Sequence, residues 1–484
     1  MRTQHNTLIP LLLAGLCAAA LPACDAPDEP DDADALLPDD VDARFVNINA
    51  GAYQHHLDRF AVRFNNPVQP GADAELGRGQ FGLAADLNTI DDALALFTGP
   101  SQLYGGAVPS NGRSCASCHR GVDVNFALPP TPLTDNGVGL DDPLFTGIAA
   151  DAGDDPDALD NLNALGLSKY RFNRFDPRIG DDNPFKQVFG WRKTPHLINI
   201  GLSNGFLNDG RGRVMFETAR GAAFTHTQNT DNRFDDLFVN PDLSSDGTFN
   251  NMEAFMFETL AFYSDPALKE LRDPGSASYD ALASDPFLTV DLDQGAPSWQ
   301  LKHKRLKGKK VFIEKCMSCH DTPNVFNSMA NVEPLGPGSR PVEFPAFAPS
   351  VGRTFNVGVA EANALGLRFT RYDGVDEEGE PVFGTIVIPL ANEDGSRTDH
   401  AVSFDIGLAA TTGRSEDIGR FKSPQLRNIK DLGPYFHDNS IDTLEGVIDY
   451  FNSDAYNDSK DGKLRPIHLS ASQRANLLEF LKVL

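Results

Sequence analysis

The pentapeptide CMSCH at residues 316–320 is nearly repeated earlier in the chain, as CASCH at residues 115–119. The two pentapeptides begin 316 − 115 = 201 residues apart and together contain four of the six cysteines in the sequence. In both, two cysteines separated by two residues are followed directly by a histidine. Most of the sulfur chemistry of this chain is therefore concentrated in two sites of one kind.

The pattern CxxCH is typical of covalent c-type haem attachment. Its two thiols lie about one helical turn apart and add to the vinyl groups of the porphyrin, and the following histidine becomes the proximal iron ligand. A structural zinc site is the alternative, but zinc does not require a histidine after the second cysteine in both copies. We predict two haems with His119 and His320 as axial ligands, attached through Cys115, Cys118, Cys316 and Cys319.

A longer repeat accompanies the two motifs. KTPHLINIGLSNGFLNDG (193–210) and KSPQLRNIKDLGPYFHDN (422–439) share the pattern K-[T/S]-P-x-L-x-N-I, and each lies downstream of its own CxxCH. An aromatic pair, Phe206 and Tyr435, and an aspartate pair, Asp209 and Asp438, follow in register. Repetition at this depth indicates two homologous modules rather than one domain with two sites.

The N-terminus has the features of an export signal. Residues 7–23 carry no charge, and the run is too short for a comfortable membrane span. LPAC (21–24) resembles a bacterial lipoprotein signal, whose cleavage leaves Cys24 as a lipidated N-terminus; Pro22 keeps ordinary signal-peptidase cleavage as the alternative. We expect a signal peptide over 1–23 and an exported protein of the periplasm or cell envelope, held to the membrane by lipid alone.

An acidic segment follows the signal. Residues 25–43 contain nine acidic residues, no basic residue and three prolines, so we expect a disordered tether over 24–44. The whole chain of 484 residues carries a net charge of 42 − 68 = −26, which argues against nucleic-acid binding because phosphates require an excess of Lys and Arg. With Cys17 in the signal and Cys24 lipidated, no cysteine pair remains for a disulfide.

Periodic hydrophobic patterns predict helices over 301–315, 443–451 and 470–484, separated by loops rich in Gly and Pro. Alternating strand patterns are few. The stretch RYDGVDEEGEPVFGTIVIP (371–389) predicts a β-hairpin, with turns at Asp373-Gly374 and Glu378-Gly379.

Together these residues resemble the bacterial di-haem cytochrome c peroxidase and MauG superfamily, from about residue 60 to the C-terminus. The most specific resemblance is SPQLRN…GPYFHDNSIDTLEGVIDYF (423–451). The resemblance implies a mainly α fold of two cytochrome c-like helical domains, over 45–295 and 296–484, with loop and small β insertions at about 121–190 and 321–415. It also implies that the C-terminal haem accepts electrons and the N-terminal haem meets peroxide or another small oxidant.

One departure from the family concerns the reacting site. The family uses a Glu to move a proton between the peroxide oxygens, and the matching stretch GAAFTHTQ (221–228) places Gln228 there. An amide can orient peroxide but does not titrate usefully. His226 could take over the acid–base role or ligate the iron; an exposed loop histidine is the alternative.

A second departure concerns the path between the haems, where the family usually has a Trp just before the Asp-Gly of the repeat. Asn208 occupies that position here. A third departure affects the C-terminal iron, because its usual distal Met or Tyr is replaced by Phe451. Tyr450 is adjacent but should point to another face of the helix. Met329, His400 and His437 remain as distal or pocket candidates.

Two charged features complete the comparison with the family. Relatives hold calcium between the domains with an Asn at the position of Lys193 and carbonyls near Pro434; an ammonium there would replace the cation, so calcium is not predicted. The basic run KHKRLKGKK (302–310) could dock an acidic electron donor, such as a small cytochrome or a cupredoxin. The alternative is the solvated face of a Lys-rich helix.

Three functions fit the sequence. The first is a haem oxidoreductase of the cytochrome c peroxidase/MauG type, which we favour because no definite sixth ligand is found for the N-terminal haem. The second is an electron-transfer cytochrome without peroxidase turnover. The third is a di-haem oxygenase of the rubber-cleaving kind, in which O₂ binds without a catalytic Glu. Gln228 counts against ordinary peroxidase turnover and keeps the other two open.

Overall fold

The structure is a computed structural model of the chain. It describes residues 68, 71–81, 115, 119, 167–171, 189–203, 205–212, 215, 216, 218, 219, 222, 248–273, 275–278, 281, 287–320, 326, 340, 341, 353–362, 371–378, 381–384, 386–402 and 404–484. The predicted signal peptide and acidic tether lie outside these residues.

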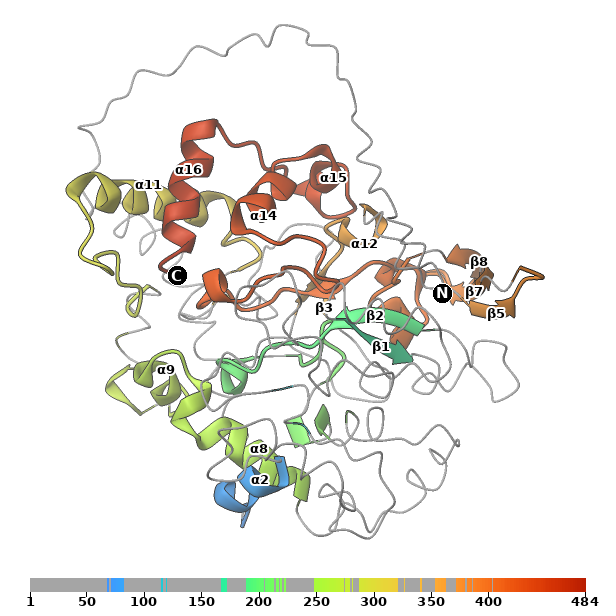
Figure 1. Ribbon diagram of the computed structural model, residues 1–484, viewed down its shortest axis with the longest axis horizontal. Coiled ribbons are helices and arrows are strands. Elements are labelled where there is room, and N and C mark those ends of the chain that lie inside the picture. The colour runs from blue at the N-terminus through green and yellow to red at the C-terminus, as the bar shows by residue number, and fades with distance from the viewer. Residues whose placement is uncertain are drawn as a thin grey trace, which may run out of the picture.

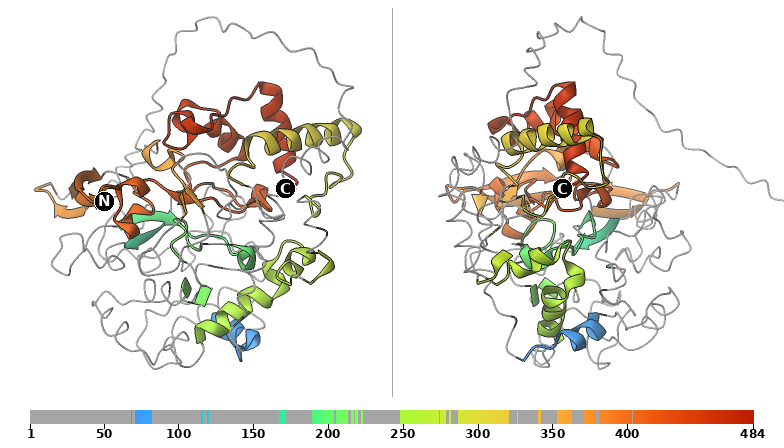
Figure 2. Two further views of the ribbon diagram at one scale, coloured as in Figure 1. Left: turned by 180° about the vertical axis from the view of Figure 1, so that it is seen from behind. Right: turned by 90° about the vertical axis from the view of Figure 1, so that its left-hand side faces the viewer.

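Apart from the short helices α12 (Val359–Ala362) and α13 (Ala409–Thr412), the described α-helices form two groups at opposite ends of the molecule, with small strands between them (Figures 1 and 2). One group contains α2 (Ala74–Phe81), α8 (Thr248–Glu258) and α9 (Pro266–Glu270). The other contains α11 (Trp299–Lys315), α14 (Leu444–Phe451), α15 (Asp454–Asn457) and α16 (Ala471–Leu481). The described part is therefore mainly helical with small sheets, as predicted; the domain boundaries stay a prediction.

Local sequence explains where the C-terminal helices begin. Ser298 caps α11 by accepting from Leu301 N, and Thr443 caps α14 by accepting from Gly446 N. Ser470 and Gln473 form a capping box at the start of α16. The three predicted helices are thus confirmed, with α11 starting two residues earlier than expected.

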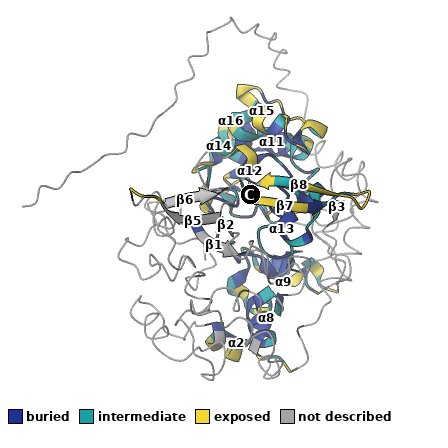
Figure 3. Cartoon of the chain, turned by 90° about the vertical axis from the view of Figure 1, so that its right-hand side faces the viewer, coloured by how far each residue is buried: buried dark blue, intermediate teal, exposed yellow. Residues whose placement is uncertain are grey.

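A glycine sets the packing of α11 on α16. A Cβ at Gly308 would lie 2.0 Å from the backbone oxygen of Asn476, so only glycine permits this close crossing. Four residues later, Phe312 is fully buried against the rings of Phe326 and Phe480. These aromatic contacts form the centre of the C-terminal core (Figure 3).

The N-terminal helix pair repeats this arrangement. A Cβ at Gly77 in α2 would lie 1.9 Å from the backbone oxygen of Asn251 in α8. Again four residues later, Phe81 is buried and contacts the rings of Phe255 and Phe262. Each CxxCH is thus preceded by a G-x-x-x-F helix that crosses a later helix through its glycine.

The described strands form small antiparallel sheets. β1 (Leu167–Arg171) pairs with β2 (Phe189–Lys193), and β3 (Arg340–Pro341), β4 (Arg353–Phe355) and β9 (Phe421–Lys422) form three strands. Two hairpins, β5 (Arg371–Val375) with β6 (Pro381–Gly384) and β7 (Ile386–Ala391) with β8 (Arg397–Val402), project from the side of the molecule (Figure 1).

The predicted hairpin within 371–389 is confirmed, but one of its turns is wrong. Asp373 and Gly374 lie inside β5, where the register shifts between Tyr372 and Gly374. The Asp-Gly pair therefore marks a β-bulge instead of a reversal, which is the other common use of glycine in a strand.

The long repeat has the same backbone in both copies. We define copy 1 as residues 192–212 and copy 2 as residues 421–441, so that equivalent positions differ by 422 − 193 = 229. The short helices Ile200–Leu202 and Ile429–Asp431 are equivalent. The isolated β-bridges Phe206–Gly212 and Tyr435–Ile441 are equivalent as well.

Positive φ angles recur at equivalent positions of the two copies. Asn199 and Asn428 have φ of 53° and 56°, and Leu207 and Phe436 have φ of 68° and 67°. Bulky side chains rarely adopt this region, so its recurrence reflects a conformation that the surrounding structure imposes. The duplication predicted from sequence is a duplication of three-dimensional structure.

Candidate functional site

The second CxxCH motif begins where α11 ends. Cys316 is the C-cap of α11, and its backbone oxygen accepts from both Cys319 N and His320 N at 3.0 Å. These turns fold the motif onto the helix end and hold the two cysteines within one tight segment. Neither Cys316 nor Cys319 forms a disulfide.

The ring of His320 is held in one orientation. Its Nδ1 lies 2.8 Å from the carbonyl oxygen of Phe326 and 3.2 Å from Ser423 Oγ. Because a carbonyl can only accept, Nδ1 carries the hydrogen, and Nε2 retains the lone pair that an iron ligand needs. Ser423 Oγ also donates to Cys319 O at 3.1 Å, which ties copy 2 to the motif.

Burial shifts the pKa of the histidine and of the first cysteine in the second motif. It lowers the pKa of His320 to about 4, so the imidazole is neutral, and burial with the nearby Cys319 raises the pKa of the Cys316 thiol to about 12. Both side chains nevertheless keep some accessible surface. A neutral, oriented imidazole beside two thiols in a poorly solvated position fits a haem bound through Cys316, Cys319 and His320.

The first motif is described at two of its positions. His119 N donates to Cys115 O at 2.9 Å, which closes one helical turn between the first cysteine and the histidine. The ring of Phe81 lies 6.4 Å from that of His119. The buried phenylalanine of the N-terminal G-x-x-x-F helix therefore packs beside the predicted iron ligand. Cys118 lies outside the described residues.

Copies 1 and 2 face one another and exchange backbone hydrogen bonds. Lys193 N in copy 1 donates to His437 O in copy 2 at 2.7 Å. Lys422 N in copy 2 donates to Asn208 O in copy 1 at 2.8 Å. Because these positions are equivalent in the repeat, the contact has approximate two-fold symmetry. We call this region the inter-copy interface.

A second pair of equivalent residues meets in the same interface. Gln425 Nε2 lies 3.5 Å from His196 Nδ1, which accepts because an amide nitrogen can only donate. Burial, together with the charges of Lys193, Lys422 and His119, lowers the pKa of His196 to about 3. His196 is therefore a neutral imidazole at the contact between the two copies.

Lys193 lies at the position for which the family resemblance implies a calcium ligand. Its ammonium donates to Pro434 O at 2.7 Å and to Leu432 O at 3.4 Å. Burial lowers the pKa of Lys193 to about 8, although the charge of Asp438 partly opposes this. These are the carbonyls to which the family resemblance pointed, and here an ammonium contacts them.

A buried ion network joins copy 1 to the inserted segment. Arg192 contacts Asp405 through two hydrogen bonds of 2.6 and 2.8 Å, and Asp209 through a third of 3.0 Å. Burial alone would lower the pKa of Arg192, but the two carboxylates raise it above its ordinary value. Asp405 belongs to the insertion at about 321–415, so the end of that insertion packs against copy 1.

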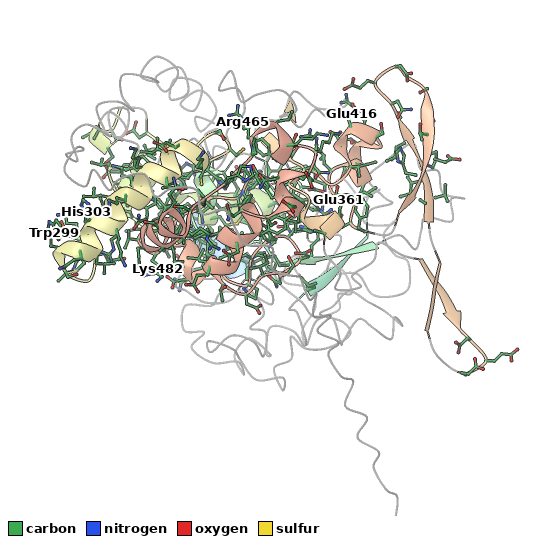
Figure 4. All side chains as sticks on the ribbon, turned by 90° about the horizontal axis from the view of Figure 1, so that it is seen from above. Trp299, His303, Glu361, Glu416, Arg465 and Lys482 are labelled. Carbon is green, nitrogen blue, oxygen red and sulfur yellow. The ribbon has the colours of Figure 1, made fainter. Side chains whose placement is uncertain are left out.

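The residues considered as distal ligands or pocket residues of the C-terminal haem lie in different parts of the structure. Tyr450 donates its hydroxyl to Val357 O at 2.8 Å, and Phe451 packs on Tyr456 with ring centroids 5.0 Å apart. His437 is buried and stacks on Phe421 at 3.7 Å. His400 lies on β8, at the opposite side of the molecule from α11 (Figures 1 and 4). A distal or pocket role for His437 stays a prediction.

The basic run on α11 is partly used within the protein. Lys302 pairs with Asp293 at 2.8 Å, Arg305 donates to two backbone carbonyls, and Lys309 lies 4.5 Å over the ring of Phe287. Trp299 and His303 stack at the outer end of the helix, where Trp299 is 73% exposed (Figure 4). These contacts account for part of the basic run, and docking of an electron donor on this helix stays a prediction.

Several predicted residues lie outside the part of the chain that the structure describes. They are Gln228, His226, Met329 and Cys24. The structure brings Cys316, Cys319 and His320 together, and it places Asn208 in the inter-copy interface beside Lys193, whose carbonyl accepts from Asn208 Nδ2 at 2.9 Å.

Several residues of this site have a weak signal in the sequence or none. Phe81 and Gly77 were detectable, because the spacing G-x-x-x-F recurs at Gly308 and Phe312. Ser423, the middle residue of the KSP pattern, gave a weaker signal. Asp405 gave none, because a single aspartate in an insertion has no local pattern that indicates a partner far away in sequence.

Comparison with known proteins supports this picture. The chain is 34% identical over 318 residues, 62% of its length, to the Cytochrome-c peroxidase IdrP2 of Denitromonas iodatirespirans, of which the match covers 70%. A match at 32% identity to the Cytochrome-c peroxidase IdrP1 of Pseudomonas sp. (strain SCT) covers 85 residues, 17% of this chain and only 22% of that relative. No protein-family profile matches the chain.

Among solved structures, a MauG-like protein associated with microbial copper homeostasis aligns with a TM-score of 0.38 and 19% identity, over 86% of this chain and 90% of that one. None of the described helices is long and apolar enough to cross a bilayer.

The fold and site define a duplicated, mainly helical protein in which each half presents a histidine-bearing CxxCH turn. The chain belongs to the bacterial di-haem cytochrome c peroxidase/MauG superfamily.

Proposed function

We propose that this chain is an exported di-haem c-type cytochrome that works as an oxidoreductase of the cytochrome c peroxidase/MauG type. It accepts electrons at its C-terminal motif and delivers them to peroxide or a related oxidant at its N-terminal motif. Haem, when bound, supplies an iron that changes oxidation state and, with an open sixth position, accepts an oxygen ligand.

The observation that carries this proposal is the short connection between the two motifs. Ser423 contacts His320, and two residues further along the same extended segment Gln425 meets His196 of copy 1. His196 belongs to copy 1, the repeat that follows the first motif. The segment that contacts the second motif therefore also contacts the repeat downstream of the first, which favours electron transfer within one molecule.

The chain's own residues define what each site contributes. Phe326 O and Ser423 keep the His320 ring in the tautomer that ligates iron. Gln228 would orient peroxide by hydrogen bonds, and His226 is the group nearest in sequence that can carry a proton. The donor would be a small cytochrome or a cupredoxin, and Cys24 would carry the lipid anchor.

The test starts with the haem content and spin state of the mature protein made in a competent host. We expect two covalently attached haems by mass, and a high-spin ferric species that binds cyanide. Peroxide consumption is then followed with a reduced small cytochrome as donor. Two low-spin haems that ignore cyanide would replace this proposal with the electron-transfer cytochrome, which the amide at Gln228 favours.

A substitution sharpens the test. Gln228→Glu should raise the rate of peroxide consumption by roughly 100-fold, the usual contribution of a positioned acid–base group. Gln228→Leu is the matched control, because it removes the amide without adding a group that titrates. Equal rates for both variants would contradict the assignment of Gln228 to the peroxide site.

A further inference from the structure

Lys193 and Lys422 are equivalent residues of the two copies, yet their ammonium groups have different surroundings. Lys193 donates to Pro434 O and Leu432 O, and the carboxylate of Asp438 acts on it. Lys422 makes no side-chain hydrogen bond or ion pair with any residue that the structure describes. Copy 2 therefore presents a cation whose charge the described protein leaves uncompensated.

The position of Lys422 makes this arrangement costly. Burial alone lowers the pKa of its ammonium to about 8, while the side chain keeps some accessible surface. An ammonium that is largely shielded from water and has no anionic partner is in an unfavourable position. A residue in this setting is expected to have an anionic partner in the functional protein.

The neighbours of Lys422 indicate which group that partner belongs to. The next residue, Ser423, contacts His320 and Cys319, and the backbone of Lys422 bonds to Asn208 in the interface. Lys422 thus lies beside the segment that holds the predicted C-terminal haem. A haem carries two propionate carboxylates on the edge opposite its vinyl groups, and these are the anions that such a prosthetic group brings into the protein.

We propose that Lys422 binds a propionate of the C-terminal haem at the inter-copy interface. This contact raises the reduction potential of the C-terminal haem. The inference rests on the proposed function, because it requires haem to be bound. Other cations of the interface have partners already: Arg192 pairs with Asp405 and Asp209, and Lys193 is bound to carbonyls.

The expected effect has a definite sign. A positive charge near the haem stabilises the reduced iron, which carries one positive charge fewer than the oxidised iron. At an effective dielectric constant of about 20, one unit charge acting on another across a partly buried site changes an equilibrium constant by roughly tenfold. Removing the charge should lower the potential.

The experiment is a spectroelectrochemical titration of both haems in the full-length loaded protein. Lys422→Gln should reduce the ratio of reduced to oxidised haem at one site by about tenfold at a fixed potential. Lys422→Arg should retain the wild-type potentials because it keeps the charge. Lys193→Gln is the matched control from the equivalent position, and it should change the potentials much less.

The outcomes separate this inference from the proposed function. If Lys422→Gln carries two haems with wild-type potentials, or if Lys193→Gln lowers them equally, the inference is wrong while the function stands. If Lys422→Gln assembles poorly, haem content decides: recovery of both haems in Lys422→Arg supports the need for a cation, and failure of both variants overturns it. A wild-type protein without haem would overturn the proposed function itself.

Discussion

Copies 1 and 2 have nearly the same backbone and very different side chains at the interface between them. In both, an asparagine at positive φ starts a short helix, and a buried aspartate accepts from the backbone two residues later, at Arg211 N or Ser440 N. At the positions that face the other copy, however, Arg192 is matched by Phe421, and Asn208 by His437.

This difference separates what the repeat needs to fold from what each half contributes to function. The shared residues satisfy backbone groups within each copy and adopt conformations that few residue types tolerate. The unshared residues determine charge, hydrogen-bonding capacity and aromatic contacts at the interface. Two modules with one backbone can therefore hold the same prosthetic group in different electrostatic environments, which is what a donor site and a reacting site require.

The largest expected effect comes from removing one attachment site at a time. Cys316→Ser with Cys319→Ser should leave one haem per chain, and Cys115→Ser with Cys118→Ser should do the same, because each CxxCH module attaches its haem independently. Intact-protein mass and the pyridine haemochrome spectrum measure this. Retention of two haems in either double variant would disprove the assignment of that motif.

The ion network that copy 1 has and copy 2 lacks gives the next effect. Arg192→Met should lower the free energy of unfolding by about 3–5 kcal/mol, because Asp405 then loses its guanidinium partner in the protein interior and Asp209 keeps only Arg211. Lys302→Met is the control. Its ion pair with Asp293 is exposed, so the free energy of unfolding should change by less than about 1 kcal/mol. Similar losses in both variants would mean that the network contributes no more than a surface pair.

The two helix crossings offer a direct comparison between the halves. Gly308→Ala and Gly77→Ala should each destabilise by about 1–3 kcal/mol, since the new Cβ would overlap backbone oxygen of the partner helix. Gly79→Ala lies in the same helix as Gly77 but meets no atom within 4 Å, so helix propensity should make it neutral or slightly stabilising. Thermal unfolding measures all three, and a stable Gly77→Ala variant would refute the close N-terminal crossing.

The smallest expected effect on stability concerns Asn199 and Asn428, which are equivalent residues of the two copies. Both have positive φ, which glycine also adopts, but the side chain of Asn199 accepts from Ser264 N at 3.0 Å. Asn199→Gly should therefore cost about 1–2 kcal/mol through the lost hydrogen bond, and Asn428→Gly less than about 0.5 kcal/mol. Equal unfolding midpoints would show that the Ser264 contact does not contribute to stability.

Much of the fold could be predicted from sequence because its signals are local. The N-caps of helices α11, α14 and α16 are Ser298, Thr443 and Ser470. Each cap depends on a residue less than one turn away. The turn expected at Asp373-Gly374 was wrong for the same reason: a short Asp-Gly signal fits a turn and a bulge equally well, and strand pairing selects between them.

The candidate site divides in the same way. The cysteines and histidines of CxxCH, and the register of the long repeat, are properties of neighbouring residues and were determined by the sequence alone. The partnership of Arg192 with Asp405, the contact between His196 and Gln425, and the contrast between Lys193 and Lys422 were decided only by tertiary structure. These contacts join residues more than 200 positions apart, and their energies depend on burial and on the partner present, which no local pattern records.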